Sequence, residues 1–169
     1  MKKLLALSVF LIAFTAAAFS QVSAQATATA TIVTSITIAT EENLSFGNIT
    51  PSISGGTVTV PPTGTPSYSG VTDSPSPVET AAINPAIFTV SGTPGAAYNI
   101  LLPGTITLTG PNGSMTVSNF TSSPDADTGG TLSDDGTEEL RVGARLNVGA
   151  NQEPGTYTSG SFDVTVNYN

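Results

Sequence analysis

The sequence contains no histidine and no cysteine, and its only two lysines are Lys2 and Lys3. Acid–base and nucleophilic catalysis usually need an imidazole, a thiolate, an amine or an activated carboxylate. Beyond residue 3 only carboxylates remain from that set. The composition therefore indicates a structural protein rather than an enzyme, and we expect no catalytic, cofactor-binding or metal-ligating residue. The lack of cysteine also excludes disulfides, so stability must come from the core or from a partner chain.

Residues 1–24 have the three parts of a secretory signal peptide. Lys2-Lys3 forms the basic start, Leu4–Phe19 is the apolar run, and Val22–Ala24 offers a small-residue cleavage site, with cleavage after Ala26 as the alternative. We expect a bacterial protein that is exported through the periplasm and is secreted or held at the cell surface. No later segment is long and apolar enough to insert into a membrane after cleavage.

The charge balance is acidic. Cleavage after Ala24 leaves 169 − 24 = 145 residues, which suits one domain with a core of its own. Removal of two lysines changes the formal net charge from −8 to −8 − 2 = −10. An acidic chain without a cluster of basic residues is a poor partner for nucleic acid and for anionic lipid.

Short alternating runs between turn residues predict the fold. All 17 glycines and all 12 prolines occur from Gly47 onward, which is too dense for helices of ordinary length. Apolar and polar residues alternate between them, as in half-buried strands, so we expect an all-β antiparallel sandwich. The predicted strands cover residues 57–60, 87–90, 98–102, 105–109, 115–120, 140–148 and 162–168. The predicted core comprises Phe46, Phe88, Val90, Ile100, Leu102, Leu108, Val142, Leu146, Phe162, Val164 and Val166.

The segment before Gly47 differs from the rest, because residues 26–38 contain neither glycine nor proline. Small or apolar residues hold nearly all of its even positions, and threonine or serine holds most of its odd ones. Thirteen residues at about 3.3 Å each would extend roughly 43 Å, about twice a typical strand. Either the run bends at Thr34 and crosses between sheets, or its first half leaves the domain as an arm.

Several motifs along the chain carry a family resemblance. They are Leu44–Ile49, Gly95–Leu102, Met115–Val117, Pro154–Tyr157 and Val164–Asn169. In their order and spacing they resemble the DUF4402 family of exported bacterial proteins, over essentially the whole mature chain. The same layout is distantly similar to spore coat protein U and to archaic chaperone–usher pilin subunits, although this chain has no cysteines where many of those pilins carry a disulfide.

The resemblance implies an immunoglobulin-like sandwich of about seven to nine strands over residues 39–169, preceded by a donor arm within residues 25–38. In such pilins an arm completes the sheet of the next subunit, which is donor-strand complementation. The implied partners are other copies of this chain or related subunits, with a periplasmic chaperone as a further candidate. The arm would present Ala26, Ala28, Ala30 and Ile32, and the groove would be lined by a closing strand with Phe162, Val164, Val166 and Tyr168.

An alternative function remains open, namely a self-complete secreted β-sandwich that binds carbohydrate or a protein partner at the cell surface. Other features have structural interpretations. Residues 125–130 superficially resemble a calcium loop, but Gly136 stands where that loop needs a bidentate glutamate. Arg141 and Arg145 share the outer face of one strand, where pairing with nearby carboxylates is expected. Tyr157 is a candidate tyrosine corner.

Overall fold

The computed structural model describes residues 22–73 and 81–169, and the chain divides into two units, residues 1–32 and 33–169. Most of the expected signal peptide lies outside the described residues. In the first unit, residues 22–32 have no secondary structure and are exposed, with Ile32 98% exposed. The predicted alternating run forms a strand only from Thr37 onward, because the residues before it pair with no other strand in the described chain.

The second unit is an all-β antiparallel sandwich, as predicted, and no helix occurs among residues 22–73 and 81–169. None of the described residues therefore forms a helix that could cross a membrane. Nine of its fourteen described strands have three or more residues. The strands are β1 Thr37–Glu42, β2 Ser45–Phe46, β3 Ile49–Thr50, β4 Gly56–Val60, β5 Ser67–Ser69, β6 Thr72–Asp73, β7 Ile83–Asn84, β8 Ala86–Ser91, β9 Ala97–Leu101, β10 Thr105–Gly110, β11 Gly113–Ser123, β12 Gly130–Thr131, β13 Thr137–Val148 and β14 Thr165–Tyr168.

The long strand β13 is the central strand of the larger sheet, whose order is β1-β8-β13-β11-β10. One edge of β13 pairs with β11, and its other edge pairs first with β8 and then with β4. The change of partner occurs at Gly143, where a side chain would collide with the backbone carbonyl oxygen of Val60. Glycine at this position therefore allows the backbone of β4 to pack closely against β13 directly after the segment that pairs with β8.

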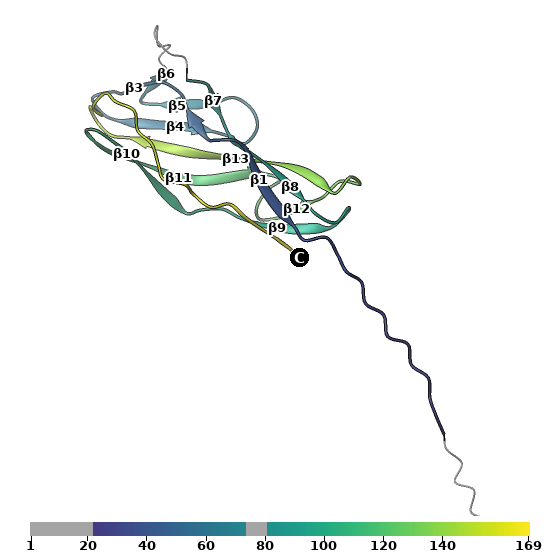
Figure 1. Ribbon diagram of the computed structural model, residues 1–169. Helices are drawn as coiled ribbons and strands as arrows, with labels where there is room; N and C mark the ends of the chain where they lie inside the picture. The colour runs from purple at the N-terminus through teal and green to yellow at the C-terminus, as the bar shows by residue number, and fades with distance from the viewer. Residues whose placement is uncertain (1–21, 74–80) are drawn as a thin grey trace, which may run out of the picture. The chain divides into compact units, whose positions relative to one another are not determined.

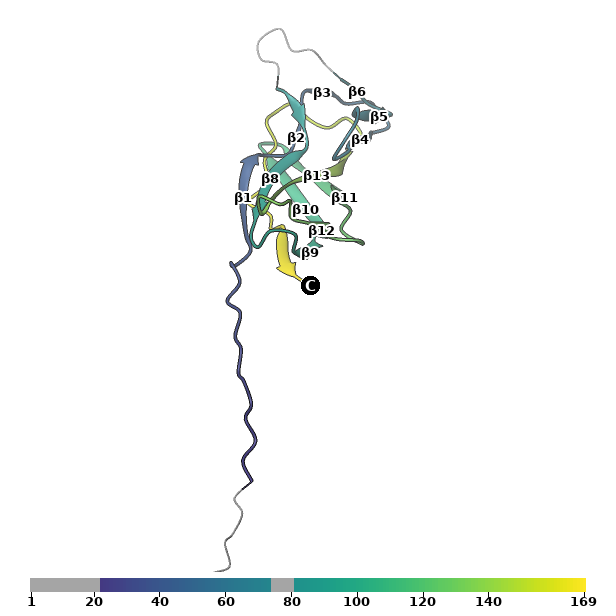
Figure 2. The same cartoon turned by 90° about the vertical axis from the view of Figure 1, so that its right-hand side faces the viewer.

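A smaller sheet, β12-β9-β14, covers only one end of the larger one; Figure 1 and Figure 2 show it as a separate layer near the C-terminus. The first core cluster lies between these layers. Its buried members are Ala86, Phe88, Val90, Tyr98, Ile100, Leu132, Leu140, Val142 and Val166. Ile36 and Ile38 pack against it from the start of β1, so the inner half of the alternating run does enter the core.

A second core cluster lies against the other end of the larger sheet. Its buried members are Phe46, Val58, Val60, Val71, Val117, Ala144, Leu146 and Val148. No strand of the smaller sheet packs on this end, and the inward side chains of β10 and β11 are only partly covered: Ile106, Leu108 and Met115 are half-buried.

Most of the predicted core is confirmed, and the exceptions are informative. Seven of the eleven predicted residues are buried, whereas Leu102, Leu108, Phe162 and Val164 are half-buried. Pro111 and Asn112 form the two-residue turn of the β10–β11 hairpin, and β5, which contains Tyr68, pairs only with β4 in the described chain. As expected for a tyrosine corner, the Tyr157 hydroxyl donates to the backbone carbonyl of Glu153 at 2.7 Å.

Candidate functional site: an apolar groove with unpaired edges

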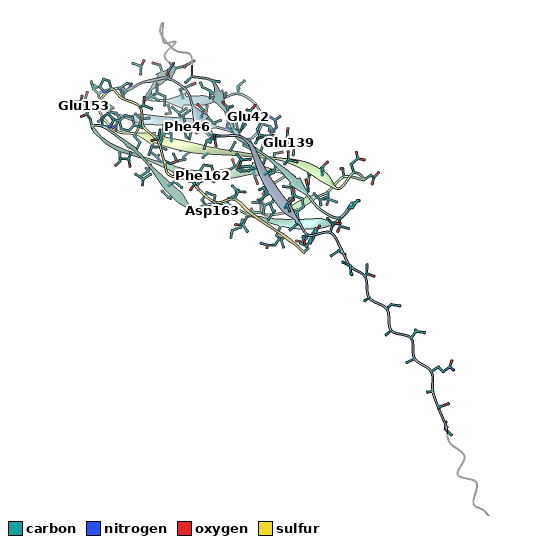
Figure 3. All side chains as sticks on the ribbon, viewed as in Figure 1. Glu42, Phe46, Glu139, Glu153, Phe162 and Asp163 are labelled. Atoms are coloured by element: carbon teal, nitrogen blue, oxygen red, sulfur yellow. The ribbon has the colours of Figure 1, made fainter. Side chains whose placement is uncertain are left out.

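A groove of about 1170 Å³ opens over the second core cluster. Its floor is the inner face of the larger sheet, with Leu108, Met115 and Leu146 among the lining residues. One wall is formed by residues 43–51 and the other by residues 152–162. Phe46 and Phe162, labelled in Figure 3, belong to opposite walls. The groove therefore lies where a second layer of strands would otherwise complete the sandwich.

Part of the backbone at the C-terminal wall is unpaired within the described chain. Thr158 exchanges two backbone hydrogen bonds with Thr109 of β10, at 2.7 and 3.0 Å, and β14 pairs with β9 from Thr165 onward. Between them, within the described chain, residues 159–164 form no backbone hydrogen bond. Peptide groups need partners when they leave water, so this stretch is a template for an added strand.

The end of β9 explains why this stretch is unpaired. Antiparallel pairing matches Thr165 with Leu101, so continuation of the ladder would bring residues 162–164 alongside Leu102, Pro103 and Gly104. Proline has no backbone N–H and interrupts a ladder. The predicted closing strand over residues 162–168 is therefore wrong in its first half, and β14 begins only at Thr165.

The N-terminal wall changes partner twice within a few residues. β1 pairs with β8 along one edge only, β2 pairs with β7, and β3 pairs with β6. Gly47, with φ of 70°, separates β2 from β3, and a side chain there would collide with Ile83. Each of these strands therefore pairs with a single other strand in the described chain.

Phe162 connects the groove with the core. Its ring centroid lies 5.6 Å from that of Phe120, at an interplanar angle of 49°. Tilted aromatic pairs at this separation are favourable. Phe162 is nevertheless half-buried, because the groove side of its ring has no strand over it. The pair helps to hold Phe162 in place, although residues 159–164 form no backbone hydrogen bond within the described chain.

The groove carries little charge. Glu153 is the one charged side chain among the described residues that line it, so no pair of carboxylates is available there for acid–base chemistry. The clearest perturbed group lies in the first core cluster instead. Burial raises the pKa of the Tyr98 phenol, and a 2.9 Å hydrogen bond to Glu138 raises it further. This pair is structural, since Tyr98 is fully buried.

Thr34 is held by two side chains at the start of the second unit. Its carbonyl accepts a hydrogen bond from the Tyr168 hydroxyl at 2.7 Å and one from the Thr93 hydroxyl at 3.3 Å. The Tyr168 hydroxyl in turn accepts from the Thr93 backbone N–H at 2.6 Å. We call this arrangement the Thr34 clasp. It joins the first residues of the second unit to the last strand.

All four residues predicted for the closing strand pack in or against the first core cluster. Phe162 also lines the groove, and Tyr168 also takes part in the Thr34 clasp. The predicted arm residues Ala26, Ala28, Ala30 and Ile32 are all exposed. Sequence reasoning missed the groove residues Leu44, Ile106 and Met115. Pro103 was the available signal, because it ends the strand that would have paired with residues 162–164.

The remaining candidate sites have structural explanations. Asp125 accepts the Asp127 backbone N–H at 2.8 Å through its side chain, which closes a turn. No three acidic side chains gather into a metal site anywhere in residues 22–73 and 81–169. Arg141 pairs with Glu139 through Nε and Oε1 at 2.6 Å, and both side chains are exposed enough for the pair to contribute little. Arg145 donates to the Thr59 hydroxyl at 3.4 Å.

Comparison with known proteins identifies a family and nothing finer. Residues 36–168 match the sequence model of a family described as a domain of unknown function, DUF4402. Searches of curated proteins and of solved structures gave no match. The predicted family is confirmed, whereas the likeness to spore coat protein U and archaic pilins stays a prediction.

Proposed function

The chain belongs to the DUF4402 family, and we propose that it is a non-enzymatic structural subunit of a bacterial surface appendage or extracellular matrix. Residues 26–33, which we call the arm, would complete a sheet in another copy by donor-strand complementation. The proposal includes export through the periplasm to the cell surface, with other copies or related subunits as partners. A periplasmic chaperone is the proposed partner before assembly.

One observation carries this proposal: the molecule has both an unfilled groove with an apolar floor and an exposed alternating segment. Residues 159–162 of the C-terminal wall form no backbone hydrogen bond within the described chain, and residues 22–32 have no secondary structure. Burial of Ile32 alone, which is 98% exposed, would contribute about 1.5–3 kcal/mol. Each backbone hydrogen bond gained along the edge would add about 0.5–1.5 kcal/mol. A strand supplied by another copy provides both contributions.

The test is to image the secreted mature protein by negative-stain electron microscopy and to compare variants of the arm. Deletion of residues 25–33 should abolish polymers and leave an aggregation-prone domain. Ala28→Asp or Ala30→Asp should also abolish polymers, because a carboxylate would then face the apolar floor of the groove.

Thr29→Asp is the matched control, since alternation places residue 29 on the opposite face of an extended strand. That variant should still assemble. If the intact protein stays monomeric at high concentration and the deletion leaves its stability unchanged, the self-complete surface module is the better description, with a carbohydrate or a protein as ligand.

A further inference from the structure

We infer that the Thr34 clasp holds the edge strand β1 in the fold when a pull acts on the arm. The pull would come from a neighbouring copy in an assembly, so this role rests on the proposed function, whereas the clasp itself belongs to the monomer. Within the described chain, no residue from Val22 to Val33 forms a hydrogen bond. Tension along the arm therefore reaches hydrogen-bonded structure first at Thr34.

β1 needs an anchor at its start because it is an edge strand with little buried surface. It pairs with β8 alone in the described chain. Ile38 is its one half-buried residue, and the other five are exposed. Segments with few buried contacts are the first to open in a folded protein. Retention of β1 therefore depends on what holds the residues just before it.

Pro94 explains why side chains, and not a longer ladder, hold those residues. Continuation of the β1–β8 register beyond its first pair would bring Thr34 alongside Pro94. Proline has no backbone N–H to donate to a carbonyl across the ladder. The Thr34 carbonyl accepts instead from the hydroxyls of Tyr168, at 2.7 Å, and Thr93, at 3.3 Å. The clasp thus supplies the donors that the backbone lacks at this point.

Tyr168 is a firm anchor, because it is itself held in three ways. Its backbone pairs with that of Tyr98 in β9, and its side chain packs against the first core cluster. Its hydroxyl donates to Thr34 and also accepts from the Thr93 backbone N–H at 2.6 Å. Thr93 follows β8 of the larger sheet, and Tyr168 ends β14 of the smaller one. The clasp therefore distributes a pull on Thr34 over both sheets.

Gly92 makes room for this arrangement. A side chain at that position would collide with the Tyr168 hydroxyl, so glycine allows the hydroxyl to reach the N–H of Thr93. The clasp can therefore be opened in two independent ways. Tyr168→Phe removes the hydroxyl and keeps the ring, whereas Gly92→Ala keeps the hydroxyl and displaces it.

Hydrogen exchange followed by mass spectrometry tests the clasp in the monomeric mature protein. In Tyr168→Phe the amides of residues 37–42 should exchange at least fivefold faster, because two hydrogen bonds are lost. Gly92→Ala should have the same effect. Tyr98→Phe is the matched control, since it also removes a hydrogen-bonded hydroxyl within the first core cluster. That variant should leave the exchange of β1 unchanged relative to β11 and β13.

Single-molecule pulling tests the response to force. The chain has no cysteine, so Thr27→Cys in the arm and Ser114→Cys on β11 provide two specific attachment points. At constant force, detachment of residues 34–42 should lengthen the chain by roughly 30 Å of contour length. Tyr168→Phe should make this step at least fivefold faster, and Tyr98→Phe should leave its rate unchanged.

The outcomes separate the clasp from the assembly. If Tyr168→Phe alters neither the exchange of β1 nor its rate of detachment, the inference is wrong and the proposed function stands. Faster exchange of all strands to the same extent would also overturn it, because the hydroxyl would then stabilise the whole domain and not β1 in particular. If the intact protein forms no filaments, the proposed function fails, and the role of the clasp in assembly fails with it.

Discussion

The groove predicts that two leucines of the same core cluster will respond differently to truncation. Leu146 on β13 is 1% exposed, whereas Leu108 on β10 is half-buried and faces the groove. We compare Leu146→Ala with Leu108→Ala in the monomeric mature protein. The first substitution removes a side chain that is fully covered in the floor of the groove, and the second removes one that is already partly exposed.

The expected magnitudes follow from burial. Leu146→Ala should lower the free energy of unfolding by about 2–5 kcal/mol, since both transfer free energy and packing are lost. Leu108→Ala removes three carbon atoms worth about 0.8 kcal/mol each when fully buried. Because the side chain is half-buried and no cavity is closed, the expected loss is about 1–2 kcal/mol.

Urea unfolding followed by circular dichroism, at a dilution where the protein is monomeric, measures both values. Leu146→Met is the control for disturbance of the strand itself and should cost less than about 1.5 kcal/mol. Equal losses for the two alanine variants would refute the reasoning, because they would mean that Leu108 is covered as fully as Leu146 in the monomer.

Three further predictions concern the rest of the fold. Burial and Glu138 raise the pKa of Tyr98 above its ordinary 10.0, so its contribution to stability should be complete below pH 10 and decline above that pH as the phenol of the unfolded chain ionises. In urea titrations, Tyr98→Phe should therefore lose less free energy of unfolding between about pH 9 and about pH 11 than the parent protein does. Gly143→Ala should lower the free energy of unfolding by about 1–3 kcal/mol through its collision with Val60, while Gly104→Ala, with open space around it, should be near neutral in the same assay. Calcium and a chelator should leave the melting temperature unchanged, since the described residues hold no cluster of three ligands; a rise of several degrees with calcium would contradict this.

The alternation of apolar and polar residues predicted the strands well. This pattern arises wherever one face of a strand is buried and the other is exposed, so it can be read from the local sequence. Leu140, Val142, Ala144, Leu146 and Val148 share one parity and are all buried. The β10–β11 turn was equally predictable, since Pro-Asn-Gly encodes it locally. These features need no knowledge of what lies across the sheet.

The groove could not be predicted in the same way, because it depends on which strands cover which end of the larger sheet. Leu108 and Val142 have the same alternating context, yet one is half-buried and the other fully buried. Phe162 and Val166 also share a parity, but β9 ends before it can pair with the residues around Phe162. Parity states which side a residue faces, and only the tertiary arrangement decides what it meets there.

The place of β13 in the larger sheet has a consequence for folding kinetics. Leu146 pairs with Val58, which lies 146 − 58 = 88 residues earlier, and Leu140 pairs with Phe88, 140 − 88 = 52 residues earlier. The β10–β11 hairpin, by contrast, closes a loop of two residues. Pairings between distant segments form slowly, because the entropy of closing long loops is lost before the contacts form. We therefore expect the hairpin to form before β13 pairs with β4 and β8, and in that interval the apolar faces of unpaired strands would be exposed to neighbouring chains.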